Sequence, residues 1–343
     1  MRYLITGGAG FIGSNTAYKL LSQGHQVVLV DDLSRVGSRK NLDWLRREYG
    51  EVSFHNQDVR DYKGLCNVIS AHHDSEVIVH LAAQVAVTTS VVNPREDLEI
   101  NALGTFNLLE AVREEGIDPV IIYSSTNKVY GATETLKVVE APTRYKYDDL
   151  QNGVDEGTPL DFHSPYGCSK GAADQYVRDY HRIYGLRTVV FRQSCIYGPR
   201  QFGVEDQGWL AWFVIASVLG RPITIYGDGK QVRDVLFIDD LVEAYVKAAD
   251  NINTTKGQVY NIGGGPEKSI SVWTEFGPIL SQLLGKNVEA AYGDWRPGDQ
   301  KVFISNISKA KQDFGWEPAI GVEDGIRRLY DWIVANKALF SDF

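Results

Sequence analysis

The chain has 343 residues, 43% of them hydrophobic and 23% charged, which is the composition of a globular protein with a substantial core. Its formal net charge of -9 argues against a general nucleic-acid binder or a membrane-surface protein, because phosphate-rich surfaces attract basic patches. The three cysteines, Cys66, Cys168 and Cys195, form no CxxC pair, so we expect a reducing compartment, no disulfide framework and no metal site.

The N-terminus enters a strand pattern directly at Tyr3–Thr6, without a charged leader before a long apolar region, so we expect no signal peptide. The most apolar helical pattern, Trp209–Leu219, is too short to cross a bilayer. We therefore expect no membrane association and a cytoplasmic location.

Short β-branched runs alternate with helical patterns through the first half of the chain. The predicted strands are Tyr3–Thr6, Gln26–Asp31, Val52–Asn56, Val77–Ala82, Val120–Ser124 and Thr188–Arg192. Asp97–Glu115, with apolar residues three and four apart, is the clearest intervening helix. This alternation predicts an α/β fold of the Rossmann type, a doubly wound parallel sheet with helices on both faces.

The second half is less regular, although the strand-like Val235–Ile238 and the helical Asp239–Ala249 indicate a return to the sheet domain. We expect two interleaved units. Residues 1–190 plus 235–264 form the sheet domain, and residues 191–234 plus 265–343 form a smaller mixed lobe, with a cleft at the carboxyl ends of the strands.

The polar connection Thr133–Pro159 is unusually long. Long connections in compact domains are often lids or binding loops, and we expect one here.

A glycine-rich turn follows the first predicted strand. Gly8, Gly10 and Gly13 fit GxGxxG, and Gly7, Gly10 and Gly13 fit GxxGxxG. Glycines at these positions permit a tight turn and close approach of the backbone to a pyrophosphate, which the following helix N-terminus attracts. A turn that merely needs glycine is the alternative, but the strand before and the helix after favour a dinucleotide site.

Asp31 ends the second predicted strand, eighteen residues beyond Gly13. A carboxylate there accepts hydrogen bonds from the adenosine ribose and repels the extra phosphate of NADP, which predicts NAD as the cofactor. Arg35 is the reservation, since a guanidinium accommodates a 2′-phosphate. Asp58 is either an acceptor for the adenine amino group or an ordinary turn residue.

Ser164 and Pro165 are a suitable N-cap and first residue for a helix that runs to about Tyr184. Tyr166 and Lys170 are four residues apart, so both side chains project from one face of that helix. A neighbouring ammonium and a positive nicotinamide ring would favour the phenolate, which makes tyrosine a usable base. The alternative is a half-buried tyrosine and a solvated lysine.

The fifth predicted strand leads into Ser124, Ser125 and Thr126. A hydroxyl at the carboxyl end of a strand points into the cleft and can share a proton with a substrate oxygen, and we select Thr126 for this role. Ser124 and Ser125 are equally explained as turn formers.

Several motifs together resemble the extended short-chain dehydrogenase/reductase superfamily of nucleotide-sugar enzymes, over nearly the whole chain. They are the glycine loop, His80–Gln84, Asn101–Ala111, the threonine, tyrosine and lysine just described, and Arg233–Val235. The resemblance implies that Thr126, Tyr166 and Lys170 are catalytic and that Lys170 also holds the nicotinamide ribose. It makes Asn101 a structural or proton-relay residue, although a helix N-cap explains Asn101 nearly as well.

The residues expected to bind NAD lie in the glycine loop, at the strand ends and on the catalytic helix. They are Gly7, Gly10, Phe11, Ile12, Gly13, Asp31, Asp32, Arg35, Asp58, Val59, Leu81, Ala82, Ala83, Gln84, Asn101, Tyr166 and Lys170.

The two residues after Thr126 bear on the reaction. The resemblance implies that 4,6-dehydratases of the superfamily carry an Asp-Glu pair there, whereas this chain has Asn127 and Lys128. Dehydration is therefore disfavoured, and reversible oxidation with epimerisation remains. We expect Lys128 itself to face outward.

Long runs such as Ser124–Gly131, Leu160–Tyr176 and Gly229–Leu236 resemble the CDP-paratose (CDP-tyvelose) 2-epimerase family. The resemblance implies oxidation at sugar C2, a 2-keto intermediate and tightly held NAD, with a CDP-hexose or another NDP-hexose such as GDP-glucose as substrate. A UDP-hexose 4-epimerase is the alternative enzyme. A non-catalytic NAD-sensing protein is less favoured, because the tyrosine and lysine are both present. By analogy with the fold group we expect a homodimer or homotetramer.

Arg233 and Arg296 are candidates to clamp the diphosphate, because planar guanidinium groups pair well with phosphate oxygens, although each is otherwise an ordinary surface charge. The complete set of expected substrate-binding residues is Gln84, Thr126, Asn127, His163, Gln193, Gln201, Gln207, Trp209, Arg233 and Arg296.

Overall fold

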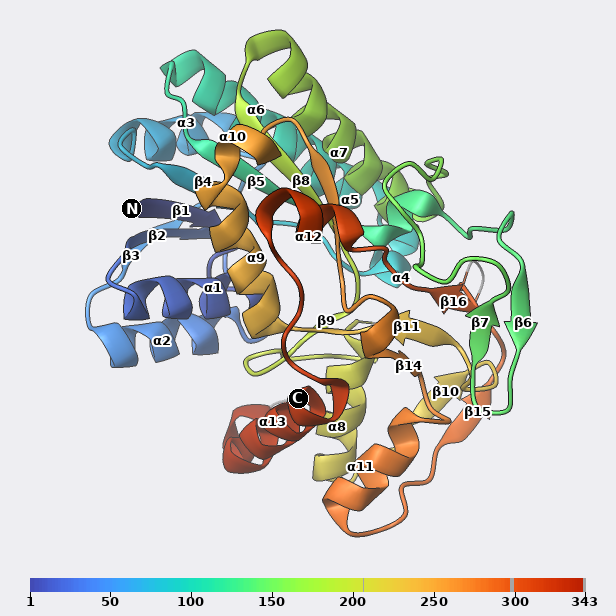
Figure 1. Ribbon diagram of the computed structural model, residues 1–343. Helices are drawn as coiled ribbons and strands as arrows, with labels where there is room; N and C mark the ends of the chain where they lie inside the picture. The colour runs from blue at the N-terminus through green and yellow to red at the C-terminus, as the bar shows by residue number, and fades with distance from the viewer. Residues whose placement is uncertain (206, 297–298, 342–343) are drawn as a thin grey trace.

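The computed structural model describes residues 1–205, 207–296 and 299–341. Within them, seven parallel strands form one sheet in the order β13-β8-β5-β4-β1-β2-β3 (Figure 1). Their bounds are β1 (Arg2–Thr6), β2 (Gln26–Asp31), β3 (Ser53–Asn56), β4 (Val77–His80), β5 (Val120–Thr126), β8 (Arg187–Gln193) and β13 (Val259–Ile262). The direction of winding reverses between β1 and β4, the point at which such folds bind ligands.

Helices cover both faces of the sheet, so its central strands are apolar on both sides. On one face, Tyr3 and Ile5 of β1 share a core with α1 (Phe11–Ser22), α2 (Ser38–Tyr49) and α9 (Ile238–Asp250). On the other face, Leu4 shares a second core with residues of three helices. These are α3 (Tyr62–Ala71), α6 (Gly104–Glu115) and α7 (Ser164–Tyr184). The predicted Rossmann-type α/β fold is confirmed.

The observed strands agree with the six predicted ones to within two residues at each end. The pattern did not identify β13, and the predicted strand-like Val235–Ile238 is the two-residue β12 (Leu236–Phe237). The predicted helix Asp97–Glu115 is interrupted. α5 (Pro94–Leu98) leads into the π-helical turn η1 (Glu99–Leu103) before α6 begins.

Beside the large sheet and its covering helices lie three small sheets and three longer helices that belong together. The sheet elements are β9 (Ile196–Tyr197) with β12, β10 (Thr224–Tyr226) with β15 (Ala291–Gly293), and β14 (Ser269–Ser271) with β11 (Val232–Asp234) and β16 (Val302–Phe303). The helices are α8 (Trp209–Leu219), α11 (Phe276–Leu284) and α13 (Val322–Ala335). α8 is apolar on nearly all sides, and its Phe213 packs against Trp273 and Phe276.

Within the range 265–343 that the sequence assigned to the smaller lobe, α12 (Ser308–Phe314) packs against β13 of the large sheet. Phe314 also stacks on Phe191 of β8. The division into two interleaved units therefore remains a proposal.

The long connection 133–159 forms the hairpin β6 (Val138–Glu140) and β7 (Tyr145–Tyr147). Arg144 pairs with Glu275, and Tyr145 donates from its hydroxyl to Asp228, so the hairpin is held against the small sheets. In the described chain none of its residues lines the main cavity, and its expected role as a lid or binding loop stays a prediction.

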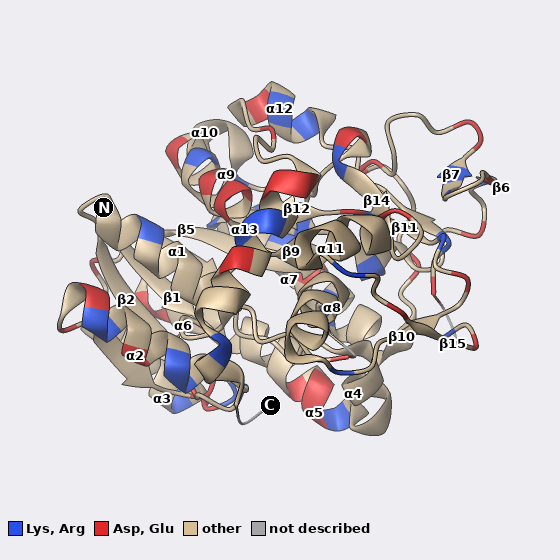
Figure 2. Cartoon of the chain, turned by 90° about the horizontal axis from the view of Figure 1, so that it is seen from below, with Lys and Arg blue, Asp and Glu red and all other residues tan. Residues whose placement is uncertain are grey.

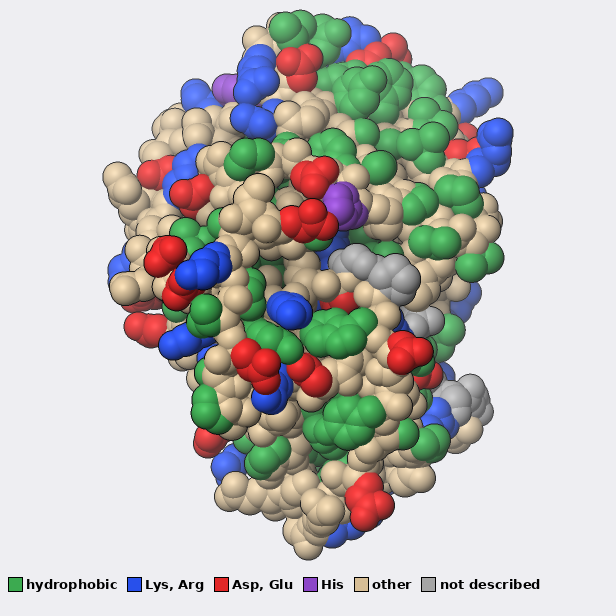
Figure 3. All heavy atoms as spheres, turned by 90° about the vertical axis from the view of Figure 1, so that its right-hand side faces the viewer, with side chains coloured by type: hydrophobic (Ala, Val, Ile, Leu, Met, Phe, Trp, Pro, Cys, Tyr) green, Lys and Arg blue, Asp and Glu red, His purple; other side chains and the backbone are tan. Residues whose placement is uncertain are grey.

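The remaining short elements are α4 (Val87–Val92), η2 (Asn127–Tyr130), α10 (Ile252–Thr255), η3 (Pro266–Lys268) and η4 (Lys337–Phe340). None of the described helices combines the length and the apolar character that crossing a membrane requires. Acidic and basic residues are interspersed along the helices in the view from below (Figure 2). On the face in Figure 3, hydrophobic side chains gather over the upper end, where Figure 1 places α6 and α7.

Candidate active site

A cavity of about 370 Å³ opens at the carboxyl ends of the large sheet. Its wall combines the glycine loop, the ends of β2, β4 and β5, the first turns of α7, and the segment 193–211. This is the position that parallel α/β sheets use for ligands, because strand ends and helix N-termini meet there.

The glycine loop is packed too closely for side chains at two positions. A Cβ on Gly13 would lie 2.2 Å from the carbonyl oxygen of Gly7. Gly7 has φ +66°, and a Cβ there would lie 2.7 Å from the backbone nitrogen of Ala82. The loop thus brings backbone N–H groups and the start of α1 to the cavity wall, which fits a dinucleotide pyrophosphate.

The carboxylate of Asp31 lines the cavity beyond the loop. It accepts hydrogen bonds from the backbone N–H of Ala9 at 3.0 Å and of Leu33 at 2.8 Å. Burial raises the pKa of Asp31, and these two bonds oppose that effect. Each carboxylate oxygen retains a lone pair for a ribose hydroxyl, so the geometry fits the predicted role.

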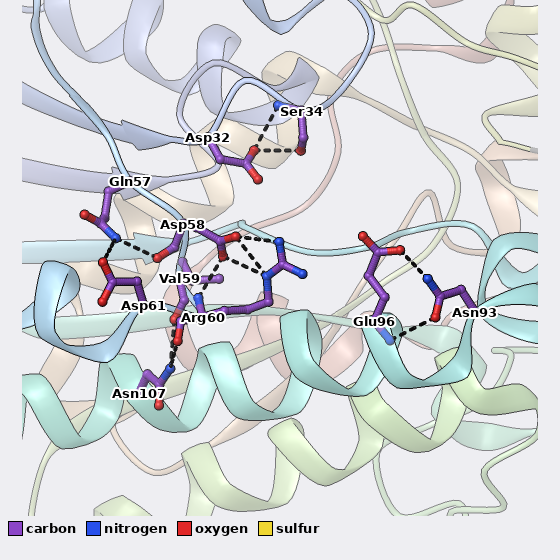
Figure 4. Close-up of polar contacts among 10 residues, drawn as sticks. All are labelled: Asp32, Ser34, Gln57, Asp58, Val59, Arg60, Asp61, Asn93, Glu96 and Asn107. Carbon is purple, nitrogen blue, oxygen red and sulfur yellow. Dashed lines mark hydrogen bonds and ion pairs between the residues drawn. The ribbon is translucent and has the colours of Figure 1, made fainter.

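Asp58 has a close partner that the sequence did not reveal. Its carboxylate accepts from both the backbone and the guanidinium of Arg60 (Figure 4). The side-chain amide of Asn107 holds this turn by donating to the carbonyl of Val59 at 2.9 Å. Asp58 and Val59 both line the cavity, and the role of Asp58 toward adenine remains a prediction.

Arg35 extends from the loop after β2 to Gln207 of the segment before α8, and their side chains form a hydrogen bond. Burial raises the pKa of Tyr166, and the positive charge of Arg35 opposes that effect. Arg35 therefore lies between the two ends of the cavity, and both it and Gln207 line the wall.

Tyr166 and Thr126 meet at the centre of the cavity. Tyr166 is 9% exposed, and burial raises the pKa of its hydroxyl to about 12, opposed by a hydrogen bond with the Thr126 side chain. A phenol with this pKa is protonated at neutral pH. Thr126 ends β5 as predicted and accepts from the backbone N–H of Lys128 at 3.3 Å.

Lys170 is 3% exposed, so the alternative of a solvated lysine is wrong. Its Nζ donates to the carbonyl oxygen of Ser124 at 2.5 Å and lies 4.4 Å from the ring centroid of Tyr123. Burial lowers the pKa of Lys170 to about 7, and the carboxylates of Asp97 and Asp174 oppose this.

A buried polar network supports Tyr166 and Lys170 from behind. The carboxylate of Asp97, fully buried, accepts from Gln84 at 2.7 Å and from Ser169 at 2.5 Å. Asn101 donates to Ser169 and accepts from the backbone N–H of Gln84. Asn101 lies inside the π-helical turn, so the N-cap explanation is wrong, and its contacts support a structural role.

The start of α7 differs slightly from the prediction. The helix begins at Ser164, which places His163 at the N-cap position. The Ser164 hydroxyl nevertheless accepts from the backbone N–H of Gly167 at 3.2 Å, the bond that an N-cap serine makes.

The segment after β8 forms the other end of the cavity. Gln193 accepts from Ser124 at 3.1 Å and donates to Tyr245 at 2.7 Å, so its orientation is set by two hydroxyls. Cys195 lines the wall with φ +36°, an uncommon backbone conformation for a residue other than glycine. Trp209 lines the same end, where it packs against Phe276.

Most predicted site residues line the cavity. Those brought together are Gly7, Gly10, Phe11, Ile12, Gly13, Asp31, Asp32, Arg35, Asp58, Val59, Leu81, Ala82, Ala83, Thr126, Asn127, Tyr166, Lys170, Gln193, Gln201, Gln207 and Trp209. Within the described chain, the predicted residues that do not line it are Gln84, Asn101, His163, Arg233 and Arg296.

Gln84 and Asn101 belong to the buried network described above, and the other three have partners elsewhere. His163 pairs with Asp161 at 3.0 Å. Arg233 pairs with Asp299 at 2.6 Å, and the guanidinium of Arg296 lies 4.0 Å from the ring centroid of Tyr226.

Two other features of the site were missed or misjudged. Lys128 is half-buried beside Arg233 and Cys195, so the expectation of an outward-facing lysine is wrong. Cys195 was not expected at the site, because nothing in a single cysteine's sequence context reveals a strained backbone. Lys128 follows Thr126 by two residues, and that proximity was the available signal.

The family model described as GDP-mannose 4,6 dehydratase matches residues 4–329. The chain therefore belongs to this family of extended short-chain dehydrogenase/reductases, as its motifs had indicated. Among its relatives, the CDP-paratose 2-epimerase of Salmonella typhi is 47% identical over 337 residues, which are 97% of this chain and 99% of that protein.

Solved structures agree with this assignment. The UDP-glucose 4-epimerase of Thermotoga maritima, determined with UDP-glucose, has a TM-score of 0.83 and 32% identity, and 98% of this chain and 100% of that chain are covered. The dTDP-glucose 4,6-dehydratase DesIV of Streptomyces venezuelae, determined with NAD, has a TM-score of 0.84 and 28% identity, with 100% and 99% covered.

Proposed function

We propose that this protein is an NAD-dependent nucleotide-sugar epimerase that inverts C2 of a hexose through a transient 2-keto sugar. The observation that carries the proposal is the cluster of Thr126, Tyr166 and Lys170 at the centre of a cavity whose glycine loop fits a dinucleotide. The 47% identity to a CDP-paratose 2-epimerase supports the choice of carbon.

NAD is the cofactor that these residues fit, as the sequence predicted. The loop at Gly7 and Gly13 would accommodate a pyrophosphate, and the carboxylate of Asp31, which lines the cavity, would hold the ribose hydroxyls and repel a 2′-phosphate. When bound, NAD supplies a hydride acceptor and donor, and its oxidised nicotinamide carries a positive charge.

Tyr166 moves the proton. Burial raises the pKa of its hydroxyl to about 12, which the charge of Arg35 opposes. The positive charge that oxidised NAD brings would favour the phenolate further, and the phenolate would accept the proton of the C2 hydroxyl during oxidation and return it during reduction. Thr126, in hydrogen-bond contact with Tyr166, orients the sugar oxygen. Inversion requires the keto sugar to turn over in the cavity, so that both faces of C2 become accessible in succession.

Lys170 contributes charge rather than a proton. Its ammonium is fixed by the carbonyl of Ser124, and the carboxylates of Asp97 and Asp174 favour the charged form. A cation held in a buried site stabilises the phenolate of Tyr166 more strongly than one in water, because the local dielectric constant is lower.

Elimination of water needs an additional acid and base beside the reacting carbons. Asn127 and Lys128 follow Thr126, and neither is a carboxylic acid. The name of the matching family model therefore does not extend to the reaction proposed for this chain.

The substrate is a nucleoside diphosphate hexose, a CDP-hexose or another NDP-hexose such as GDP-glucose. A UDP-hexose 4-epimerase is the second candidate, because the T. maritima enzyme with this name shares the fold over the whole chain. Both use the same three catalytic residues and differ in the carbon placed before Tyr166.

The test is to incubate purified enzyme with CDP-, GDP- and UDP-hexoses and to resolve the product sugars by NMR. Inversion at C2 without net change in bound NAD supports the proposal. A C4-inverted product with retained C2 identifies the 4-epimerase instead, and binding of NAD without turnover of any sugar identifies a sensing protein.

We also propose that the chain assembles as a homodimer or homotetramer through α7 and the adjoining segment 94–103. Tyr176, Ile183 and Tyr184 on α7 are exposed, as are Leu98 at the end of α5 and Leu103 at the end of η1, and α5 and η1 both pack against α7. Light scattering on purified protein measures the state, and a monomer at micromolar concentration contradicts the proposal.

A further inference from the structure

Gln201 carries an unused hydrogen-bond acceptor at the wall of the cavity. The residue lines the cavity and is 9% exposed. In the part of the chain that the structure describes, its buried Oε1 has no hydrogen-bond partner. Its Nε2 donates to the carbonyl oxygen of Ile196 at 3.4 Å, which identifies Oε1 as the atom that remains. A buried acceptor without a partner costs free energy, which a donor on a bound ligand would recover.

The backbone before Gln201 is held by two helices of the large domain. The side-chain amide of Asn15 on α1 donates to the carbonyl oxygen of Pro199 at 3.0 Å. The side-chain amide of Asn41 on α2 donates to the carbonyl oxygen of Arg200 at 3.3 Å. Arg200 has φ +68°, a conformation that residues other than glycine keep where their surroundings fix it. The position of Gln201 is therefore set by contacts that do not involve a ligand.

The amide of Gln201 lies at the end of the cavity that the segment after β8 forms. β5 and β8 pair with Thr126 opposite Gln193, and Ile196 follows Gln193 by three residues. A Cβ on Gly208 would lie 2.6 Å from Nε2 of Gln201, so the amide also packs against the start of α8. Thr126, Ile196 and Gly208 line the same cavity. The acceptor is therefore on the Thr126 side, where the hexose is expected.

A rotation of the amide presents Oε1 to the cavity. The atom is shielded from solvent by its surroundings. The last torsion of a glutamine side chain is broad, so the amide turns at low cost. The bond from Nε2 to Ile196 is long for a hydrogen bond and opposes this rotation only weakly.

We propose that Oε1 of Gln201 accepts a hydrogen bond from a hydroxyl group of the hexose other than the one that reacts. The inference rests on the proposed function and names a sugar contact that discriminates between substrates. In the proposed reaction, Thr126 and Tyr166 hold the reacting hydroxyl, and the phosphates of a nucleotide sugar are themselves acceptors. A buried acceptor favours sugars with a hydroxyl at the matching carbon and rejects the corresponding deoxy sugars.

The test measures the coupling between Gln201 and single hydroxyl groups. Calorimetry on the NAD-containing enzyme compares CDP-glucose and GDP-glucose with their 2-, 3-, 4- and 6-deoxy counterparts and with CDP, for the wild type and for Gln201→Met. We expect the wild type to bind one deoxy sugar, altered at a carbon that does not react, about tenfold to a hundredfold more weakly than its parent. Gln201→Met has no acceptor and should bind that sugar and its parent almost equally. Gln201→Glu keeps an acceptor and should retain the discrimination.

The matched control is Gln282→Met, at an exposed glutamine of α11 that does not line the cavity. It should leave all of these affinities unchanged. Circular dichroism establishes folding, and Gln201→Leu replaces the methionine variant if that one does not fold.

The failure of the inference and the failure of the proposed function give different results. Equal discrimination by the wild type and Gln201→Met, or no discrimination by either, overturns the inference even when the wild type inverts C2. Loss of bound NAD, or an equal loss of affinity for CDP and for every sugar, assigns the contact to the cofactor or the nucleotide and also overturns it. A wild type that inverts C4, or no carbon, overturns the proposed function regardless of the coupling. Inversion at C2 together with coupling to one hydroxyl supports both.

Discussion

The two ends of the cavity are built in different ways. At the cofactor end, one short motif and the ends of neighbouring strands supply the wall, and the close contact between Gly7 and Gly13 arises within seven residues of chain. At the sugar end, Cys195 and Trp209 line the same cavity as Thr126, although they lie far from it in the sequence. Nearby, Arg233 already forms an ion pair with Asp299.

This difference affects how each end of the cavity binds its ligand. At the cofactor end, backbone N–H groups and a helix N-terminus form the wall that fits a pyrophosphate, so this geometry exists before any ligand arrives. At the sugar end, side chains with existing partners must exchange them for a ligand. We therefore expect variants at the sugar end to change substrate affinity and turnover while bound NAD stays constant.

The largest effect should come from Tyr166→Phe, which removes the proton-transfer group where the two ends meet. We expect kcat to fall about 100- to 10,000-fold, the usual contribution of general acid–base catalysis, with bound NAD unchanged. Tyr176→Phe on the exposed side of α7 is the control. Full turnover by Tyr166→Phe would mean that another group is the base.

Lys170→Met should separate activity from stability. We expect turnover to be nearly lost, because the cation beside the phenolate is removed, while the free energy of unfolding rises, because burial of the ammonium outweighs its attraction to Asp97 and Asp174. Thermal denaturation of both proteins measures the gain.

The gain should depend on pH in a defined direction. The folded pKa of Lys170 is lowered to about 7, so the burial penalty is complete below pH 7 and diminishes as the pH rises toward the ordinary value for lysine. The variant's advantage should therefore be largest at pH 6 and smaller at pH 9. An advantage that grows with pH would contradict the assigned cause.

Gly13→Ala should disrupt the cofactor end alone. The added Cβ would lie 2.2 Å from the Gly7 carbonyl, so the loop must open. We expect at least about tenfold weaker NAD binding, with about 1–3 kcal/mol lost from the free energy of unfolding. Absorbance of released NAD measures the occupancy. Gly321→Ala, where nothing lies within 4 Å, is the control, and wild-type occupancy in Gly13→Ala would refute the close-packing argument.

Cys195→Val should have the smallest effect and disturb the sugar end alone. A β-branched side chain is strained at the φ of +36° that Cys195 adopts, and its extra volume extends the wall into the cavity. We expect KM for the nucleotide sugar to rise about tenfold or less, equivalent to ~1.4 kcal/mol, with NAD content unchanged. Cys66→Val, away from the cavity lining, is the control. Loss of NAD together with the KM change would show that the two ends are not independent.

Local pattern explains which parts of the fold were predictable. The positions of β2 and the other predicted strands could be read from runs of β-branched residues. The position of α7 could be read from its 3.6-residue periodicity and from Ser164 and Pro165 at its start. Each of these signals lies within a single element. The interruption at η1 was not visible, since a π-helical turn adds a single residue to an otherwise helical pattern. β13 was missed because a four-residue buried strand has too few residues for a clear period.

The sequence alone determined the cofactor loop, the pairing of Tyr166 with Lys170 on one helix and the position of Thr126, because each depends on spacing within a few residues. Only the tertiary structure decided that Lys128 is half-buried, that Asp97 lies near Lys170, and that the hairpin at 138–147 contacts Asp228 and Glu275 and does not line the cavity. These features depend on segments far apart in the chain, and sequence spacing carries no record of which distant surfaces pack together.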